Sequence, residues 1–216
     1  MQQIAKTPVH VTAGSSPGRL LFALDATASR GPGWQLAMQT QQAMFQKVAD
    51  LGGLEIQLAY YRGLAEFWAS AWHNTPQALV SCMAKVYCVQ GLTQIRRVLQ
   101  HALEESRNGK INALVFIGDS VEENPTRLQD LAGQLGIKGI PAFLFQDGFD
   151  PNTETVFAQL ARLSGGASVR FNADSPEQLK ALLEAVAVYA TGGRKALLQL
   201  TQQSTHEVKH LIQQLR

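Results

Sequence analysis

Two apolar segments, each followed by an aspartate, constrain the fold of this chain most strongly. Residues 20–25 read Leu-Leu-Phe-Ala-Leu-Asp, and a second apolar run over 111–117 leads into Gly118 and Asp119. A continuous apolar run of this length is typical of a strand buried on both faces, as in a parallel sheet. The sequence therefore predicts two buried parallel strands, each with an acidic side chain at its carboxyl end.

Shorter patterns extend this interpretation along the chain. We expect further strands over 54–61, 64–69, 140–145 and 168–171, and helices over 34–51, 93–107, 125–135, 153–163 and 176–189, with a short helix opened by Thr75 and Pro76. The segments on either side of Gly63 are expected to form a hairpin at the sheet edge. Alternating strands and helices predict an α/β fold: a doubly wound, mainly parallel sheet of about six strands flanked by helices.

The chain of 216 residues suits one domain with appendages. Residues 1–19 are polar and broken by glycine and proline, so we expect a loosely held N-terminal lead-in before a domain over 20–192. Gly192 and Gly193 then precede residues 193–216, which we expect to form an amphipathic C-terminal helix. That helix could dock on this domain or on a partner.

Composition excludes several classes of partner. The net charge is +2, with 19 basic and 17 acidic residues spread along the chain, which argues against nucleic acid or an anionic membrane as the principal partner. Residues 1–19 lack the apolar run of a signal peptide, and no stretch approaches the ~20 apolar residues of a membrane span, so the expected location is cytoplasmic. The spacing of Cys82 and Cys88 fits neither a metal knuckle nor a redox pair, and we expect both near the core.

The first aspartate begins a run of alternating oxygen-bearing side chains. The chain reads Asp25-Ala26-Thr27-Ala28-Ser29, and this spacing in an extended turn lets three side chains converge on one point. Ligands of doubly wound sheets gather beyond the carboxyl ends of the strands. Hard divalent cations such as Mg²⁺ favour oxygen ligands with few carboxylates and retained waters. A divalent cation site is therefore expected at this edge.

This D-x-T-x-S run resembles the first motif of the metal-ion-dependent adhesion site (MIDAS) of von Willebrand factor A (VWA) domains. The family's second motif, a threonine that opens a helix after glycine, is similar to Gly91-Leu92-Thr93, and its third is similar to Gly118-Asp119. The resemblance covers about residues 20–190 and is greatest to bacterial, stand-alone, intracellular members. The chain departs from the family pattern at Leu92 and Ser120, where glycine is frequent.

The resemblance implies a metal site and a function. The implied cofactor is Mg²⁺ (or Mn²⁺ or Ca²⁺), and the implied ligands are Asp25, Thr27, Ser29, Thr93 and Asp119. The implied function is a non-enzymatic, metal-dependent protein-binding adaptor, whose protein partner completes the metal shell with an Asp or Glu carboxylate. We expect Arg30, Trp68 and Trp72 to surround the mouth of the site and contact that partner, because arginine and aromatic residues are enriched in binding hot spots. Packing at the edge of the hairpin is the alternative for both tryptophans.

Two other functions remain open. In a metal-free scaffold with the same fold, Arg30 could neutralise the two aspartates. The segment 116–120 also resembles the nucleophile block of GDS-type esterases, with Ser120 as nucleophile and Glu207 and His210 as the nearest candidates for acid and base. That family carries its block near the N-terminus and follows serine with leucine, whereas here the block lies mid-chain and Val121 follows.

Two further signals do not indicate ligand sites. His206 and His210 lie four residues apart but lack a third zinc ligand, which favours a solvated helix face. The glycine-rich turns contain no nucleotide-binding motif.

Overall fold

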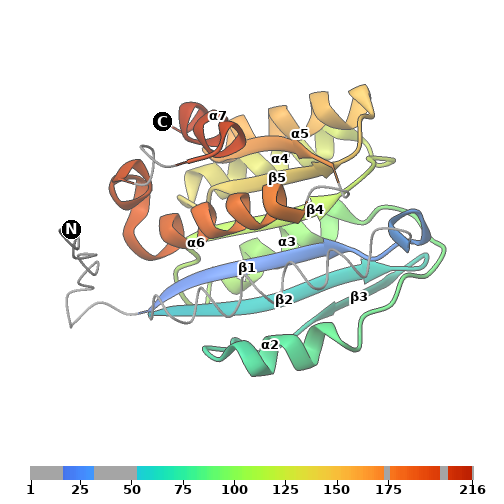
Figure 1. Ribbon diagram of the computed structural model, residues 1–216. Helices are drawn as coiled ribbons and strands as arrows, with labels where there is room; N and C mark the ends of the chain where they lie inside the picture. Colours follow the sequence, from blue (N-terminus) through green and yellow to red (C-terminus); the bar gives the residue numbers. More distant parts are fainter. Residues whose placement is uncertain (1–16, 32–52, 173–175, 200–203, 216) are drawn as a thin grey trace.

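A six-stranded sheet in the order β3-β2-β1-β4-β5-β6 forms the centre of the computed structural model, which describes residues 17–31, 53–172, 176–199 and 204–215 (Figure 1). Every neighbouring pair is parallel except β2 and β3, which form the expected antiparallel edge hairpin. The strands are β1 (Gly18–Asp25), β2 (Leu54–Arg62), β3 (Glu66–Ala69), β4 (Ala113–Gly118), β5 (Ala142–Asp147) and β6 (Ala167–Phe171).

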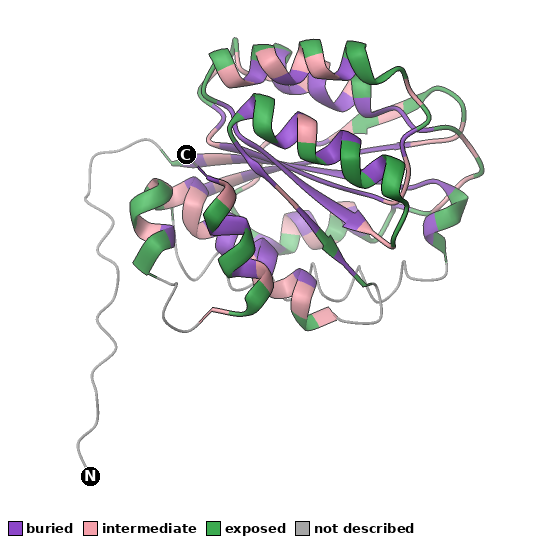
Figure 2. Cartoon of the chain, turned by 90° about the horizontal axis from the view of Figure 1, so that it is seen from above, coloured by how far each residue is buried: buried purple, intermediate pink, exposed green. Residues whose placement is uncertain are grey.

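Helices cover both faces of this sheet and complete two separate cores. One face packs against α2 (Pro76–Met83), α6 (Pro176–Gln199) and α7 (His206–Gln214), and the other against α3 (Ile95–Glu105), α4 (Pro125–Ile137) and α5 (Pro151–Ser164). Figure 2 shows the buried strands enclosed between these two helical layers. The predicted doubly wound α/β fold with a mainly parallel sheet is confirmed.

The two apolar runs form the middle of the sheet, as the sequence predicts. In β1, Leu20, Phe22 and Leu24 point into one core while Leu21 and Ala23 point into the other. Successive side chains of a strand point to opposite faces, so a strand with helices on both sides must be apolar throughout. This requirement explains why the runs do not alternate with polar residues.

Helix α3 begins later than the sequence indicates. Thr93 was expected to open it, but the helix starts at Ile95, and its N-cap residue Gln94 makes no side-chain capping bond. The carboxylate of Glu123 accepts hydrogen bonds from the main-chain N–H groups of Ile95 and Arg96 instead. The cap is therefore supplied by a distant loop, which the local sequence does not reveal. The helix predicted over 34–51 lies outside the described residues.

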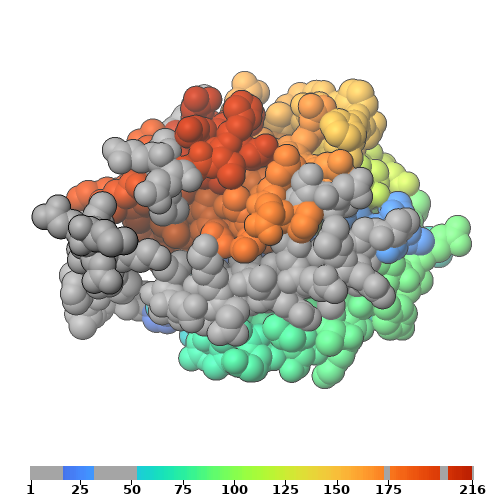
Figure 3. Space-filling view, in the orientation of Figure 1, coloured from blue at the N-terminus to red at the C-terminus, as the bar shows by residue number. Residues whose placement is uncertain are grey.

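The expected single helix over 193–216 is divided in the structure. Gly193 has a non-helical conformation with φ of 65°, and the chain beyond it continues as the end of α6. Ser204 and Thr205 are not helical, and α7 is a separate short helix. Leu197 and Leu211 are fully buried in the core beside the sheet, so both segments dock on this domain. Figure 3 shows α7, in red, packed beside orange residues of the chain that precedes it.

Two smaller expectations can also be compared with the structure. Cys82 and Cys88 are both free and half-buried, and both pack against the core. None of the described helices has the length and apolar character that crossing a membrane requires.

The docking of the segment after Gly193 can be tested with two adjacent leucines. Leu197→Ala removes a fully buried side chain and should lower the free energy of unfolding by about 2–5 kcal/mol. Leu198→Ala, at a side chain that is 41% exposed, should change it by less than about 0.5 kcal/mol. Urea denaturation of the two variants measures the difference, and equal losses would show that this segment does not pack as described.

Candidate functional site

Asp25 ends the central strand β1 and is held by two hydrogen bonds. Its side chain is fully buried. One carboxylate oxygen accepts the main-chain N–H of Thr27 at 2.7 Å, and the other accepts the hydroxyl of Tyr61 at 2.8 Å. Tyr61 lies directly opposite Asp25 in the pairing of β1 with β2. The position of this carboxylate is therefore fixed by both its own turn and the neighbouring strand.

The turn after β1 presents the two hydroxyls of the first motif. Thr27 forms an isolated parallel bridge with Val89, and the main-chain N–H of Val89 donates to Ala26 O at 3.0 Å. The short 3-10 helix η1 (Ala28–Arg30) follows. The hydroxyl oxygens of Thr27 and Ser29 lie 3.2 Å apart, with Thr27 buried and Ser29 exposed. Alternate residues therefore converge, as the spacing predicts.

Thr93 is brought to this turn by a close contact between two glycines. A Cβ atom on Gly91 would lie 2.0 Å from the carbonyl oxygen of Gly63, so only glycine fits there. The main-chain N–H of Leu92 donates to that same oxygen at 3.2 Å, while the Leu92 side chain is 53% exposed. Because Leu92 points outward, its presence in place of the family's glycine does not displace Thr93.

A reciprocal pair of hydrogen bonds then fixes Thr93. Its main-chain N–H donates to the Glu122 carboxylate at 2.9 Å, and the Glu122 N–H donates to the Thr93 hydroxyl oxygen at 3.1 Å. The Thr93 hydroxyl keeps its proton and a second lone pair for another partner. The loop after β4 thus holds the residue of the second motif.

Asp119 lies beside Asp25. The strand pairing places Leu24 opposite Ile117, and a Cβ on Gly118 would lie 3.6 Å from Cβ of Asp25. Burial raises the pKa of Asp25 above its usual value, and the negative charge of Asp119 raises it further, while the hydrogen bonds from Thr27 and Tyr61 oppose the shift. Oδ1 of Asp119 is buried and has no hydrogen-bond partner in the described chain. An unpaired buried carboxylate oxygen is costly, so this position favours a cation.

A cavity of about 200 Å³ connects these elements. A water molecule occupies about 30 Å³ in the liquid, so a cation with several waters would fit. Thr27, Ser29 and Thr93 all line the cavity, and Ser120, at the other departure from the family pattern, lines it as well. The structure therefore gathers the expected residues at one place, with Asp25 and Asp119 beside them.

The structure does not place the three expected partner-contacting residues together. Arg30 is buried and forms an ion pair with Asp147 at the end of β5. It bonds neither Asp25 nor Asp119, so the neutralising role considered for Arg30 is not observed. Its side chain is engaged inside the protein and does not surround an open mouth.

The two tryptophans occupy different places. Trp72 lies near Arg19, with the guanidinium 5.0 Å from its ring centre, and its indole N–H donates to Glu105 at 2.7 Å. Its neighbour His73 bridges to Ile56, at the level of Leu20. At about 3.3 Å per residue this level is roughly 16 Å from Asp25 along the strand. Trp72 therefore lies near the amino ends of the parallel strands, whereas Asp25 lies at their carboxyl ends.

Trp68 is nearer to the site. It lies opposite Tyr60 in the hairpin, with the ring centres 5.4 Å apart, and it is 38% exposed. Because β3 is separated from β1 by β2, Trp68 is about 10 Å to the side of β1. Packing on the hairpin accounts for its position.

Three supporting residues were not found by the sequence reasoning. Tyr61 orients Asp25, Glu122 holds Thr93, and Glu123 caps α3. Tyr61 lies at the end of a strand that the sequence predicted, but the pairing of that strand with β1 was not predicted. The two glutamates contact residues almost thirty positions away, and no local pattern indicates those contacts.

The esterase alternative lacks its base at this site. Glu207 and His210 line a different cavity, beside β6, and no described histidine lines the cavity that contains Ser120.

The chemistry of the donor set suits a hard cation. Among the described residues, no group of three or more histidine, cysteine, aspartate or glutamate side chains is placed to hold a metal ion. The set gathered here is of another kind, with two carboxylates and three hydroxyls, which are oxygen ligands suited to Mg²⁺.

Comparison with known proteins identifies the fold. No family model and no curated protein sequence matches this chain. Among solved structures, the SpRpn10 VWA domain has a TM-score of 0.62 at 12% identity, over 78% of this chain and 97% of that one. The vWF domain of the type V pili tip protein Mfa5 from Porphyromonas gingivalis has a TM-score of 0.64 at 10% identity, over 81% and 95%. The ArnB paralog VWA2 from Sulfolobus acidocaldarius has a TM-score of 0.57 at 14% identity, over 78% and 46%. The chain thus has the fold of VWA domains.

The glycine contact that positions Thr93 can be tested by substitution. Gly91→Ala places a methyl group against the Gly63 carbonyl and should lower the free energy of unfolding by about 1–3 kcal/mol. Gly133→Ala, inside α4 with no neighbouring atom near the added carbon, should raise it by about 0.5–1 kcal/mol. Thermal and urea unfolding should therefore show shifts of opposite sign; a neutral Gly91→Ala would contradict the close contact.

Proposed function

We propose that this chain is a VWA-type protein-binding module whose site at the carboxyl edge of the sheet holds a divalent cation, with Mg²⁺ the first candidate and Mn²⁺ or Ca²⁺ the alternatives. The observation that carries the proposal is the buried Asp119 oxygen, which has no hydrogen-bond partner among the described residues, beside the buried carboxylate of Asp25. Thr27, Ser29 and Thr93 would offer hydroxyl oxygens directly, and the aspartates would bind directly or through water.

The electrostatics of the edge support a cation over a metal-free scaffold. Two neighbouring carboxylates need a proton, a metal or a basic side chain to offset their repulsion. The nearby guanidinium of Arg30 is engaged with Asp147, and no described basic side chain bonds either aspartate. A divalent ion satisfies this requirement at neutral pH without protonating Asp25.

The bound cation would supply an open coordination position for an oxygen ligand. The hydrogen bonds that Thr27 and Tyr61 donate to Asp25 partly offset the negative charge of this carboxylate. The cation would therefore keep enough positive charge to attract another carboxylate. The ligand we propose is an Asp or Glu side chain of a protein partner, and no covalent reaction is involved. Exposed Leu92, next to Thr93, would contact that partner around the carboxylate.

The VWA-type neighbours support an adaptor role by analogy of fold alone. One of them is the tip protein of a pilus, and another is the VWA domain of SpRpn10. For this chain, the bacterial, stand-alone, cytoplasmic setting indicated by the sequence remains a prediction.

Cation binding should raise thermal stability by mass action. At a free Mg²⁺, Mn²⁺ or Ca²⁺ concentration ten times the dissociation constant, the gain is about 1.4 kcal/mol, or roughly 3–6 °C in Tm. Asp25→Asn should abolish the gain, whereas Asp130→Asn, at an exposed carboxylate on α4, should retain it. Differential scanning fluorimetry over a titration from chelator to excess ion measures this. A wild-type Tm unchanged by all three ions would favour the metal-free scaffold.

Partner binding should depend on the same ion. Protein captured from native cell extract on the immobilised chain should be retained in Mg²⁺ and released by EDTA, and Asp25→Asn should lose it even in Mg²⁺. Quantitative mass spectrometry of the eluates, with Asp130→Asn as the matched control, identifies proteins with this pattern. Retention that is identical with and without chelator would contradict the metal-dependent mode.

A further inference from the structure

We propose that the open edge of β6 is a docking site for an extended polypeptide segment, which would add a strand to the sheet. This inference is independent of the cation site, which lies beyond the ends of β1 and β4. It rests on a groove along the edge strand and on the way this protein's own side chains already bond that edge.

A groove follows β6 between α5 and α7. A cavity of about 630 Å³ is lined by every residue from 168 to 172, with Glu154 and Ala158 of α5 on one side and His210 of α7 on the other. A second cavity of about 290 Å³ extends past Gly165 and Gly166, and both cavities share Ala158 and Gln214 in their lining. The two cavities thus form a groove that follows the outer edge of β6.

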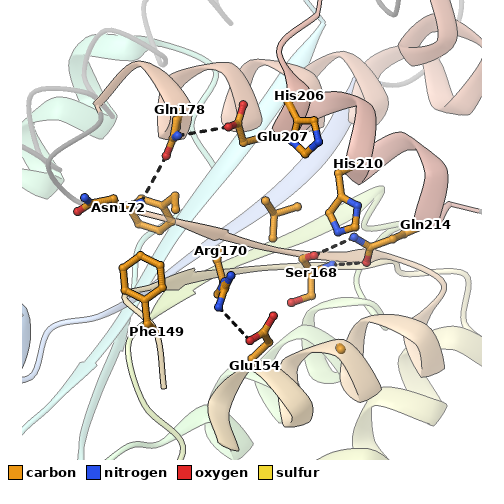
Figure 4. Close-up of a pocket in the computed structure, with 13 residues that line it drawn as sticks. Phe149, Glu154, Ser168, Arg170, Asn172, Gln178, His206, Glu207, His210 and Gln214 are labelled. Carbon is orange, nitrogen blue, oxygen red and sulfur yellow. Dashed lines mark hydrogen bonds and ion pairs between the residues drawn. The ribbon is translucent and has the colours of Figure 1, made fainter. Parts of the chain in front are cut away.

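Gln214 shows how this edge recognises an amide. Its side-chain oxygen accepts the main-chain N–H of Ser168 at 2.9 Å, and its side-chain nitrogen donates to the carbonyl of Ser168 at 2.8 Å (Figure 4). A neighbouring strand would supply the same donor and acceptor from its backbone. The primary amide of Gln214 therefore imitates one peptide group of an added strand.

Arg170 is the next residue of β6 whose main-chain N–H and C=O point away from β5, and no side-chain amide of the described chain bonds them. Main-chain groups of a strand alternate in direction; those of Ser168 point away from β5, while the Phe171 carbonyl accepts the N–H of Gly148 on the β5 side. The N–H and C=O of Arg170 therefore point into the groove, and no hydrogen bond to them is found within the described chain. The N–H of Asn172 is met by the Gln178 side chain at 3.4 Å.

The groove also provides surfaces for the side chains of a peptide. Phe149 is 68% exposed, and the guanidinium of Arg170 lies 5.2 Å from its ring centre while bonded to Glu154 at 3.1 Å. Figure 4 shows Phe149, Arg170 and Glu154 on one side of the strand and His206 and His210 on the other. An apolar side chain of the peptide would pack on Phe149, and polar side chains would face the histidines.

The walls of the groove favour a single extended segment over a second copy of this chain. Edge-to-edge pairing of two copies would bring the α5 and α7 helices of each against those of the other. A peptide has no such flanking helices and can enter between them. Main-chain pairing of this kind binds an extended peptide through its backbone and selects it through alternate side chains.

A defined peptide tests the proposal. The probe is the capped heptapeptide Thr-Phe-Thr-Val-Thr-Lys-Thr, titrated to millimolar concentration into the full-length ¹⁵N-labelled protein. We expect the amide resonances of residues 168–172 to shift, and the same peptide N-methylated at its interior amides to cause no shift, because it cannot donate to the Arg170 carbonyl.

Two substitutions at position 170 separate the contribution of the main chain to peptide binding from that of the side chain. Arg170→Pro removes the N–H donor and should weaken binding about tenfold, the effect expected from losing one hydrogen bond. Proline is tolerated at an edge strand where its nitrogen faces outward, and a melting curve checks the fold. Arg170→Ala keeps the donor and should change affinity by less than about threefold, because the ion pair it loses is exposed. Gln214→Ala exposes Ser168 and should strengthen binding.

Three results would overturn the proposal. One is equal binding of the N-methylated peptide, which needs no variant and so holds even if Arg170→Pro fails to fold. Another is the absence of shifts at residues 168–172 at millimolar peptide. The third is a concentration-dependent dimer, seen by sedimentation and lost in Gln214→Ala or Arg170→Pro, which would assign the edge to a second copy of this chain.

Discussion

The hydrogen-bonded burial of Asp25 at the end of the central strand is the constraint around which the site is organised. A carboxylate at this position loses nearly all contact with water, so its charge must be stabilised by donors and by whatever else lies beside it. The turn supplies one donor and β2 supplies the other. Strand order thus determines the electrostatics, because Tyr61 can reach Asp25 only if β1 and β2 are neighbours in this register.

The acidic groups at the carboxyl ends of the strands differ in whether a basic side chain pairs with them. Asp147, at the end of β5, has its own guanidinium partner in Arg30. Asp25 and Asp119, at the ends of the two central strands, have no basic partner among the described side chains. The carboxyl ends of the strands therefore carry one carboxylate that is paired with a guanidinium and two neighbouring carboxylates that no described basic side chain pairs with. These two lie beside a cavity lined with hydroxyls.

Much of this arrangement could be predicted from sequence, and the remainder could not for specific reasons. The apolar runs ending at Asp25 and Asp119 require a sheet covered on both faces, and the carboxyl ends of parallel strands bring their acidic residues together. Thr27 and Ser29 converge because their spacing is local. The start of α3 and the burial of Arg30 depend on Glu123 and Asp147, which are distant in sequence. Trp72 was misplaced because a return strand carries the chain away from the site, although the hairpin itself was expected.

The geometry of the site depends on the loop after β4 as well as on the residues that supply its oxygen ligands. This short stretch carries Asp119, holds Thr93 through Glu122, and caps α3 through Glu123. The same loop thus positions both Thr93 and Asp119. A substitution at Glu122 or Glu123 would therefore alter the geometry of the site as much as the substitution of one of its oxygen ligands. Sequence variation at positions 122 and 123 should accordingly be restricted together with that at Asp119.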